Sequence, residues 1–172
     1  MYISKKVKLL TIFLLLSSFS FSQTQEFTLS ELTEVAFMPI SSIDSFLRVK
    51  NYKYKPSEIN KGDNDFIYYE NIYKKTYANG VIISPEKFSN MTTTHSITIV
   101  KSDDKLYNEL KKEVKDNPNT KKMREEIDNI KSITVYSDGL TESNFTIHSM
   151  DGYIVYSVQI RFNPSLEYLK KK

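Results

Sequence analysis

The hydrophobic positions along this chain first recur at helical spacing and later alternate, and the change indicates the order of the secondary-structure elements. Thr28 and Glu31 have the spacing of a helix capping box. We therefore predict a helix that begins there and is broken or kinked at Pro39. A second helix is predicted from Ser41 to about Asn51, because its apolar positions again lie three or four residues apart.

From Tyr52 onward the pattern is typical of strands. Residues 52–55 alternate, and residues 66–73 are rich in aromatic and β-branched side chains. The pair Asn79-Gly80 stands between two short apolar runs and predicts a two-residue hairpin turn, since Asn and Gly accept positive φ. Residues 94–100 also alternate, which places His95, Ile97 and Ile99 on one face of a strand.

The second half of the chain repeats the change from helical to strand spacing. Ser102 to Asp104 predict the start of a helix that ends near residue 116. Met123, Ile127 and Ile130 lie at helical spacing and predict a further short, charged helix. Strands are predicted at the following three segments, with turns at Asp138-Gly139 and Asp151-Gly152: 133–136, 145–150 and 153–162.

This order predicts an α+β fold with a mainly antiparallel sheet of about seven strands and with helices on one face. A loose tandem duplication, in which a helix followed by a meander occurs twice, is a second prediction. Such units occur in β-lactamase-inhibitor-like and TATA-binding-like folds, an analogy of architecture that says little about function.

The N-terminus has the three parts of a secretory signal peptide. A basic segment with Lys5, Lys6 and Lys8 precedes a short apolar run, and small residues follow at Ser20 and Ser22. We expect cleavage after Ser22, because the apolar run of about eight residues is well short of the roughly 20 that a membrane span needs. The domain plan is then a signal peptide at 1–22 and a single α+β domain at 23–172, with 163–172 as a tail.

Removal of the leader changes the charge of the chain. The full sequence has 24 basic and 21 acidic residues, and without the three leader lysines the two counts are equal. The pI of about 8.8 therefore reflects the leader. A mature chain of net charge near zero gives no reason to expect a nucleic-acid partner, and no later segment is long or apolar enough to span a membrane.

The end of the leader also carries a resemblance. Its sequence Ser20-Phe21-Ser22-Gln23, followed by a chain rich in Lys, Asn, Ile and Tyr, resembles the small secreted proteins of flavobacteria-like (Bacteroidetes) bacteria. The resemblance implies a periplasmic or extracellular address and no particular activity.

Composition excludes several kinds of chemistry. The chain has no Cys, so disulfides, Cys-ligated zinc, iron–sulfur clusters and thiol nucleophiles are excluded. Its four Gly do not form a phosphate-binding loop. His95 and His148 have no partner histidine at a metal-ligand spacing, and there is no Gly-x-Ser-x-Gly motif. We therefore expect no metal and no cofactor.

Tyrosine is the most distinctive feature of the composition, with 12 residues in the chain. Tyr68 and Tyr69 are adjacent, so in a strand they point to opposite faces. Exposed tyrosines suit contact with proteins or glycans, although tyrosine is also simply a good strand residue. We name Tyr68, Tyr69 and Tyr77 as candidate partner contacts.

Taken together, the sequence favours an exported, non-enzymatic binding or accessory domain of the cell envelope. Its partner is expected to be another envelope or secreted protein, contacted through an exposed face or edge of the sheet. Two alternatives remain open, namely a small secreted hydrolase with a dispersed carboxylate or histidine site, and a carrier of small ligands. The oligomeric state is not predicted.

Overall fold

A computed structural model describes residues 26–55, 67–71, 79–86, 94–150 and 152–162. The predicted leader (1–22), the predicted tail (163–172) and Tyr77 lie outside these residues. The described part contains three helices and eight strands. The helices are α2 (Leu29–Phe37), α3 (Ile40–Val49) and α4 (Lys105–Asp116). The strands are β1 (Tyr52–Tyr54), β2 (Ile67–Asn71), β3 (Gly80–Glu86), β4 (Thr94–Lys101), β5 (Lys121–Ile127), β6 (Lys131–Ser137), β7 (Thr141–Met150) and β8 (Tyr153–Phe162).

All eight strands belong to one antiparallel sheet in the order β1-β2-β3-β4-β8-β7-β6-β5. Each half of the chain contributes a meander of four strands, preceded by α2 and α3 in the first half and by α4 in the second. The halves meet where β4 pairs with β8. The predicted α+β class is confirmed, and the tandem helix-plus-meander order is present, with eight strands instead of about seven.

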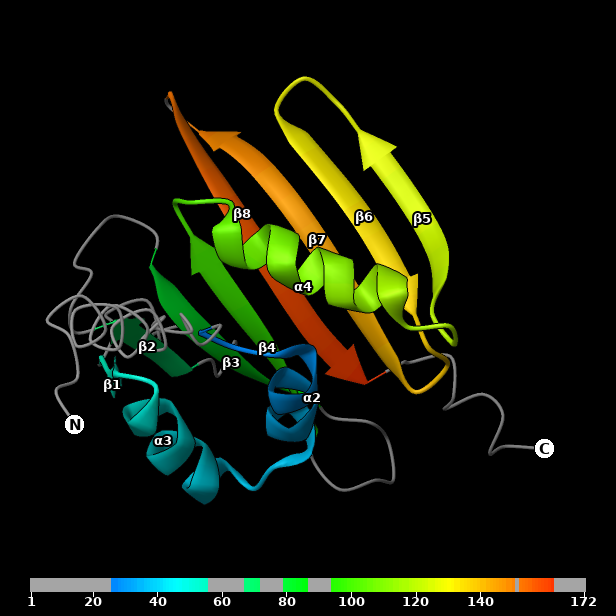
Figure 1. Cartoon of the computed structure of the whole chain (residues 1–172). Coiled ribbons are helices and arrows are strands. Elements are labelled where there is room, and N and C mark those ends of the chain that lie inside the picture. The colour runs from blue at the N-terminus through cyan, green and yellow to red at the C-terminus, as the bar shows by residue number, and fades with distance from the viewer. Residues whose placement is uncertain (1–25, 56–66, 72–78, 87–93, 151, 163–172) are drawn as a thin grey trace, which may run out of the picture.

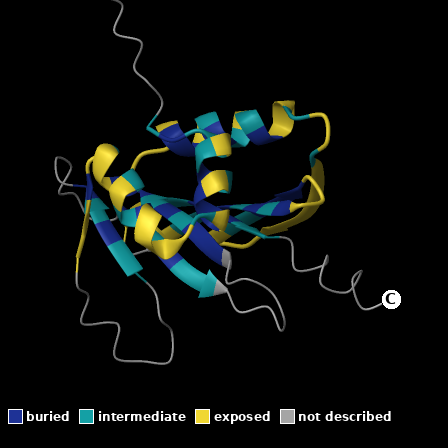
Figure 2. Ribbon diagram, turned by 90° about the horizontal axis from the view of Figure 1, so that it is seen from below, coloured by how far each residue is buried: buried dark blue, intermediate teal, exposed yellow. Residues whose placement is uncertain are grey.

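The helices form a single layer over one face of the sheet (Figures 1 and 2). The core lies between the two layers, where the helices contribute Leu32, Val35, Leu47 and Leu110 and the sheet contributes alternate residues of each strand. In β4, His95, Ile97 and Ile99 are all buried on this side, as their alternation predicts. None of the described helices is long and apolar enough to cross a bilayer.

The predicted start of the first helix is confirmed by its capping box, whereas α3 begins at Ile40, one residue before the predicted start, and has no side-chain cap. The Thr28 hydroxyl accepts a hydrogen bond from the Glu31 amide, and the Glu31 carboxylate accepts one from the Thr28 amide. Pro39 separates α2 from α3. Asn51, which follows α3, has φ 66°, a left-handed conformation that Asn tolerates and that turns the chain into β1.

The predicted helix around Met123, Ile127 and Ile130 is wrong, because this segment is β5 and the turn that follows it. The three apolar side chains are 63%, 73% and 59% exposed, so their helical spacing marks no buried face. Instead, the carboxylate of Asp128 accepts hydrogen bonds from the amides of Ile130 and Lys131 and closes a hairpin. Pairing with β6 across this hairpin fixes the strand.

The predicted Asn79-Gly80 hairpin turn is also wrong. Gly80 lies within the sheet, where it is paired with Glu70 of β2 and Val100 of β4. The glycine is needed for another reason, because a Cβ built at this position would lie 2.7 Å from Cζ of Tyr68. The turn at Asp138-Gly139 is confirmed, with φ of 93° at Gly139. Of the predicted Asp151-Gly152 turn, Gly152 has φ of 83°, and Asp151 lies outside the described residues.

Candidate functional site

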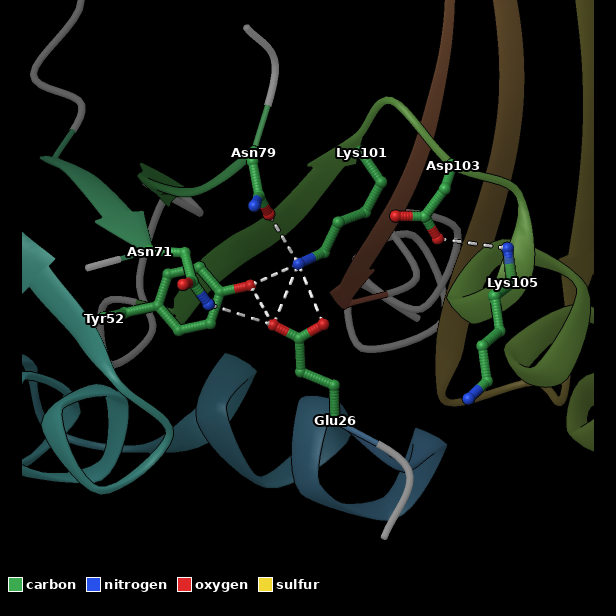
Figure 3. A network of polar contacts seen from close by, with 7 residues as sticks. All are labelled: Glu26, Tyr52, Asn71, Asn79, Lys101, Asp103 and Lys105. Atoms are coloured by element: carbon green, nitrogen blue, oxygen red, sulfur yellow. Dashed lines mark hydrogen bonds and ion pairs between the residues drawn. The ribbon is translucent and has the colours of Figure 1, made fainter. Parts of the chain in front are cut away.

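A buried polar network lies at one end of the first meander (Figure 3). Its centre is Lys101, the last residue of β4, which is 3% exposed. Because Lys101 continues the alternation of Ile97 and Ile99, its side chain enters the core side of the sheet. Tyr52 at the start of β1 and Asn79 just before β3 reach the same point.

The contacts within the network are short. The Lys101 ammonium lies 2.8 and 2.9 Å from the two carboxylate oxygens of Glu26. It also donates to Asn79 Oδ1 at 2.7 Å and to Tyr52 Oη at 2.5 Å. The Tyr52 hydroxyl and Asn71 Nδ2 both donate to Glu26 Oε1, at 2.5 and 3.4 Å. The network therefore fastens the segment before α2 to three strands, β1, β2 and β4.

The electrostatics of the network favour a structural role. Burial and the Glu26 carboxylate raise the pKa of Tyr52 far above its ordinary value of 10, so its phenol stays protonated at neutral pH. The Lys101 ammonium is paired with the Glu26 carboxylate. A protonated phenol and a paired ammonium are poorly suited to act as bases. We interpret the cluster of Glu26, Tyr52, Asn71, Asn79 and Lys101 as a structural clamp that holds the segment before α2 to the sheet.

The opposite face of the sheet has a different character. We call it the helix-free face, because no described element packs on it (Figure 2). By strand alternation it carries the polar and charged residues Ser96, Thr98, Glu142, Asn144, Thr146, Ser157, Gln159 and Arg161. Most of them are half-buried.

Side chains on the helix-free face are organised by hydrogen bonds across the strands. Asn144 Nδ2 donates to Gln159 Oε1 at 3.0 Å, and Gln159 Nε2 donates to Ser96 Oγ at 3.4 Å. Arg161 donates to Glu142 Oε2 at 2.6 and 3.0 Å. The centre of this face therefore presents an ordered polar surface.

The two adjacent tyrosines occupy opposite faces, as predicted. Tyr68 lies half-buried on the helix-free face, with its ring beside Gly80. Tyr69 is 4% exposed and belongs to the core, where its ring lies 6.0 Å from that of Tyr54. A side chain so deeply buried offers a partner little surface, so we no longer consider Tyr69 a candidate partner contact.

The two histidines are not brought together. His95 is buried on the helix side of β4, whereas His148 is half-buried on the helix-free side of β7, and β8 separates the two strands. Within the described segments, no group of three or more metal-ligating side chains could hold a metal ion. Burial lowers the pKa of His95, and its Nδ1 has no hydrogen-bond partner.

Sequence reasoning missed the network of Glu26, Tyr52 and Lys101. One signal was available, because Lys101 is the next residue on the face that carries Ile97 and Ile99. A lysine at such a position needs a carboxylate partner if it is buried. Nothing in the sequence indicates that this partner is Glu26, which lies 75 residues away.

Comparison of the chain with protein-family models, with curated proteins and with solved structures returned no match.

Proposed function

We propose that this chain is an exported, non-catalytic binding module of the cell envelope that contacts a protein partner through the helix-free face. The observation that carries the proposal is the composition and order of that face. Half-buried Asn144, Gln159 and Arg161 side chains are hydrogen-bonded there across the strands, with no described layer over them.

The helix-free face differs from a surface that is covered within a fold. A face packed under another layer carries alternating apolar residues, as the helix side of β4 does with Ile97 and Ile99. The corresponding helix-free positions of β4 and β8 are mainly polar, with Ser96, Thr98, Ser157, Gln159 and Arg161 beside Val100 and Val155. Non-obligate protein interfaces are about as polar as ordinary protein surface and use many hydrogen bonds, which fits this composition.

The export part of the proposal rests on the leader sequence. Lys5, Lys6 and Lys8, the short apolar run and Ser22 have the order of a signal peptide. A protein exported in this way meets its partners in the envelope or outside the cell, so those fractions are where the partner is sought.

The test is affinity capture with the exported, processed protein as bait against envelope and secreted fractions of its host. Captured proteins are identified by mass spectrometry and titrated for saturable binding. Thr98→Arg places a long cation at the centre of the helix-free face without touching the core, so we expect it to abolish capture of the specific partner.

Ser45→Arg is the matched control. Ser45 is exposed on α3 in the helical layer, so the same new side chain lies on the opposite side of the molecule. We expect this variant to capture the partner as the wild type does. The proposal fails if the folded wild type captures no saturable partner, or if Thr98→Arg captures it equally well.

A further inference from the structure

Strand β5 forms one outer edge of the sheet (Figure 1). All seven of its residues are exposed, and among the described strands only β6 pairs with it. An edge strand presents unpaired backbone groups that can pair with another chain. Proteins commonly protect such edges with charges, and β5 is rich in charged residues, so the arrangement of these charges decides which strands it can accept.

The charges of β5 are separated along the strand. Lys121 and Lys122 occupy its beginning, and Glu125 and Glu126 occupy its end. If a second copy of β5 is placed antiparallel about a twofold axis that passes between Met123 and Arg124, Lys121 lies opposite Glu126 of the second copy. Lys122 then lies opposite Glu125 of the second copy, and symmetry repeats both pairs.

The faces of these side chains agree with this pairing. The register with β6 places Lys122 and Glu125 on the helix side of the sheet, and Lys121 and Glu126 on the helix-free side. The irregularity in register between Lys122 and Arg124 is responsible, because in a regular strand residues 122 and 125 point to opposite faces. Each Lys therefore meets a Glu that projects on its own side.

We propose that β5 is the interface of a symmetric homodimer, in which two copies pair antiparallel along this edge. The pairing joins two eight-stranded sheets into one continuous sheet and places both helix-free faces on the same side. The proposal does not depend on the proposed function.

The charge pattern also explains why the occupant is a second copy in this one orientation. Parallel pairing of two β5 strands places Lys beside Lys and Glu beside Glu, which is unfavourable. In the single chain the same groups already pair locally, since Lys122 contacts Glu125 and Arg124 lies 3.3 Å from Glu126. Because exposed ion pairs are individually weak, backbone hydrogen bonds provide affinity and the charges select the orientation.

The test measures self-association by analytical ultracentrifugation. The sample is the protein expressed from the full sequence and processed by the cell that produces it. The wild type is examined at concentrations up to about 1 mM, which reaches the weakest association of interest. The double variant Lys121→Glu/Lys122→Glu leaves Arg124 as the only basic residue of β5. The double variant Glu125→Lys/Glu126→Lys leaves β5 with no acidic residue. We expect each variant alone to self-associate at least about tenfold more weakly than the wild type.

Mixing the two variants in equal amounts restores opposite charges across the interface, and we expect a heterodimer at least as stable as the wild-type dimer. Recovery on mixing also shows that both variants are folded. Lys53→Glu/Lys55→Glu, a matched charge reversal in and beside β1 at the opposite edge of the sheet, should leave the wild-type association unchanged. A monomeric wild type, or a dimer that neither charge reversal weakens, overturns the proposal.

Discussion

Replacing Lys101 with methionine keeps the length of the side chain and removes its charge from the buried network. The substitution deletes the donor to Glu26, Tyr52 and Asn79 and leaves the Glu26 carboxylate without its cation. Replacing Glu26 with glutamine is the complementary change, because it keeps the shape of the carboxylate and leaves the ammonium without its counter-ion. The two changes together measure how strongly the pair is coupled.

The exposure of the two partners sets the magnitude of each effect. Removing one partner of a buried ion pair costs about 3–5 kcal/mol. The Lys101 side chain is 4% exposed and that of Glu26 is 27% exposed, so water reaches the carboxylate more easily than the ammonium. We therefore expect a loss of about 3 kcal/mol in the free energy of unfolding for Lys101→Met and about 4 kcal/mol for Glu26→Gln.

The double variant leaves neither charge unpaired, so its cost should be less than the sum of the single costs by about 2 kcal/mol. Equilibrium unfolding in urea gives each free energy. Tyrosine fluorescence and far-ultraviolet circular dichroism are suitable probes because the chain has no Trp. Typical domains have about 5–15 kcal/mol of stability, so a chain at the upper end of that range keeps all three variants folded at 25 °C.

Additive costs would refute this account of the network. If the double variant loses the sum of the two single losses within about 0.5 kcal/mol, Glu26 and Lys101 are not energetically coupled. A loss below about 1 kcal/mol for Lys101→Met would likewise show that the ammonium is not held in a dry site.

Two further predictions concern single buried contacts. Burial lowers the pKa of His95 below 6.5, so the unfolded chain binds a proton that the folded chain does not, and stability should fall as pH decreases below about 6.5. His95→Leu should add about 1 kcal/mol at pH 7 and reduce this loss between pH 7 and pH 5; an unchanged pH slope would contradict the prediction. Gly80→Ala should cost about 1–3 kcal/mol, because its Cβ meets the Tyr68 ring, and should cost less in a Tyr68→Ala background. An equal cost in both backgrounds would exclude that contact as the cause.

Much of the fold was predictable because local signals agreed with tertiary structure. The capping box at Thr28 and the apolar stripe of α4 each depend on residues close together in the chain. In β8 the apolar alternation is imposed by one covered and one uncovered face, and Val158 and Ile160 are buried as it requires.

The errors occurred where distant contacts override local pattern. Met123, Ile127 and Ile130 lie at helical spacing, yet the residues on both sides of Met123 pair with β6, as Ile127 does, and Ile130 lies in the turn that follows. Asn79-Gly80 has the sequence of a tight turn, but position 80 requires a glycine because the Tyr68 ring packs against it and leaves no room for a Cβ. Such contacts join residues that are too far apart in the sequence for a local pattern to relate them.

The candidate site was harder to predict than the fold. Strand alternation correctly separates Tyr68 from Tyr69, but sequence alone does not tell which face the helices cover. That information comes from packing, and it moves Tyr69 into the core while leaving Tyr68 on the helix-free face. The clamp of Glu26 on Lys101 depends on a contact across 75 residues and is visible only in the folded chain.

The measurement that tests the central claim most directly is side-chain footprinting by hydroxyl radicals on the protein alone and on its captured complex. The account predicts that oxidation of Tyr68 and His148, which lie on the helix-free face, decreases in the complex. It predicts no change at Phe37, which is 43% exposed in the helical layer. Protection at Phe37 with unchanged oxidation of Tyr68 and His148 would contradict binding through the helix-free face.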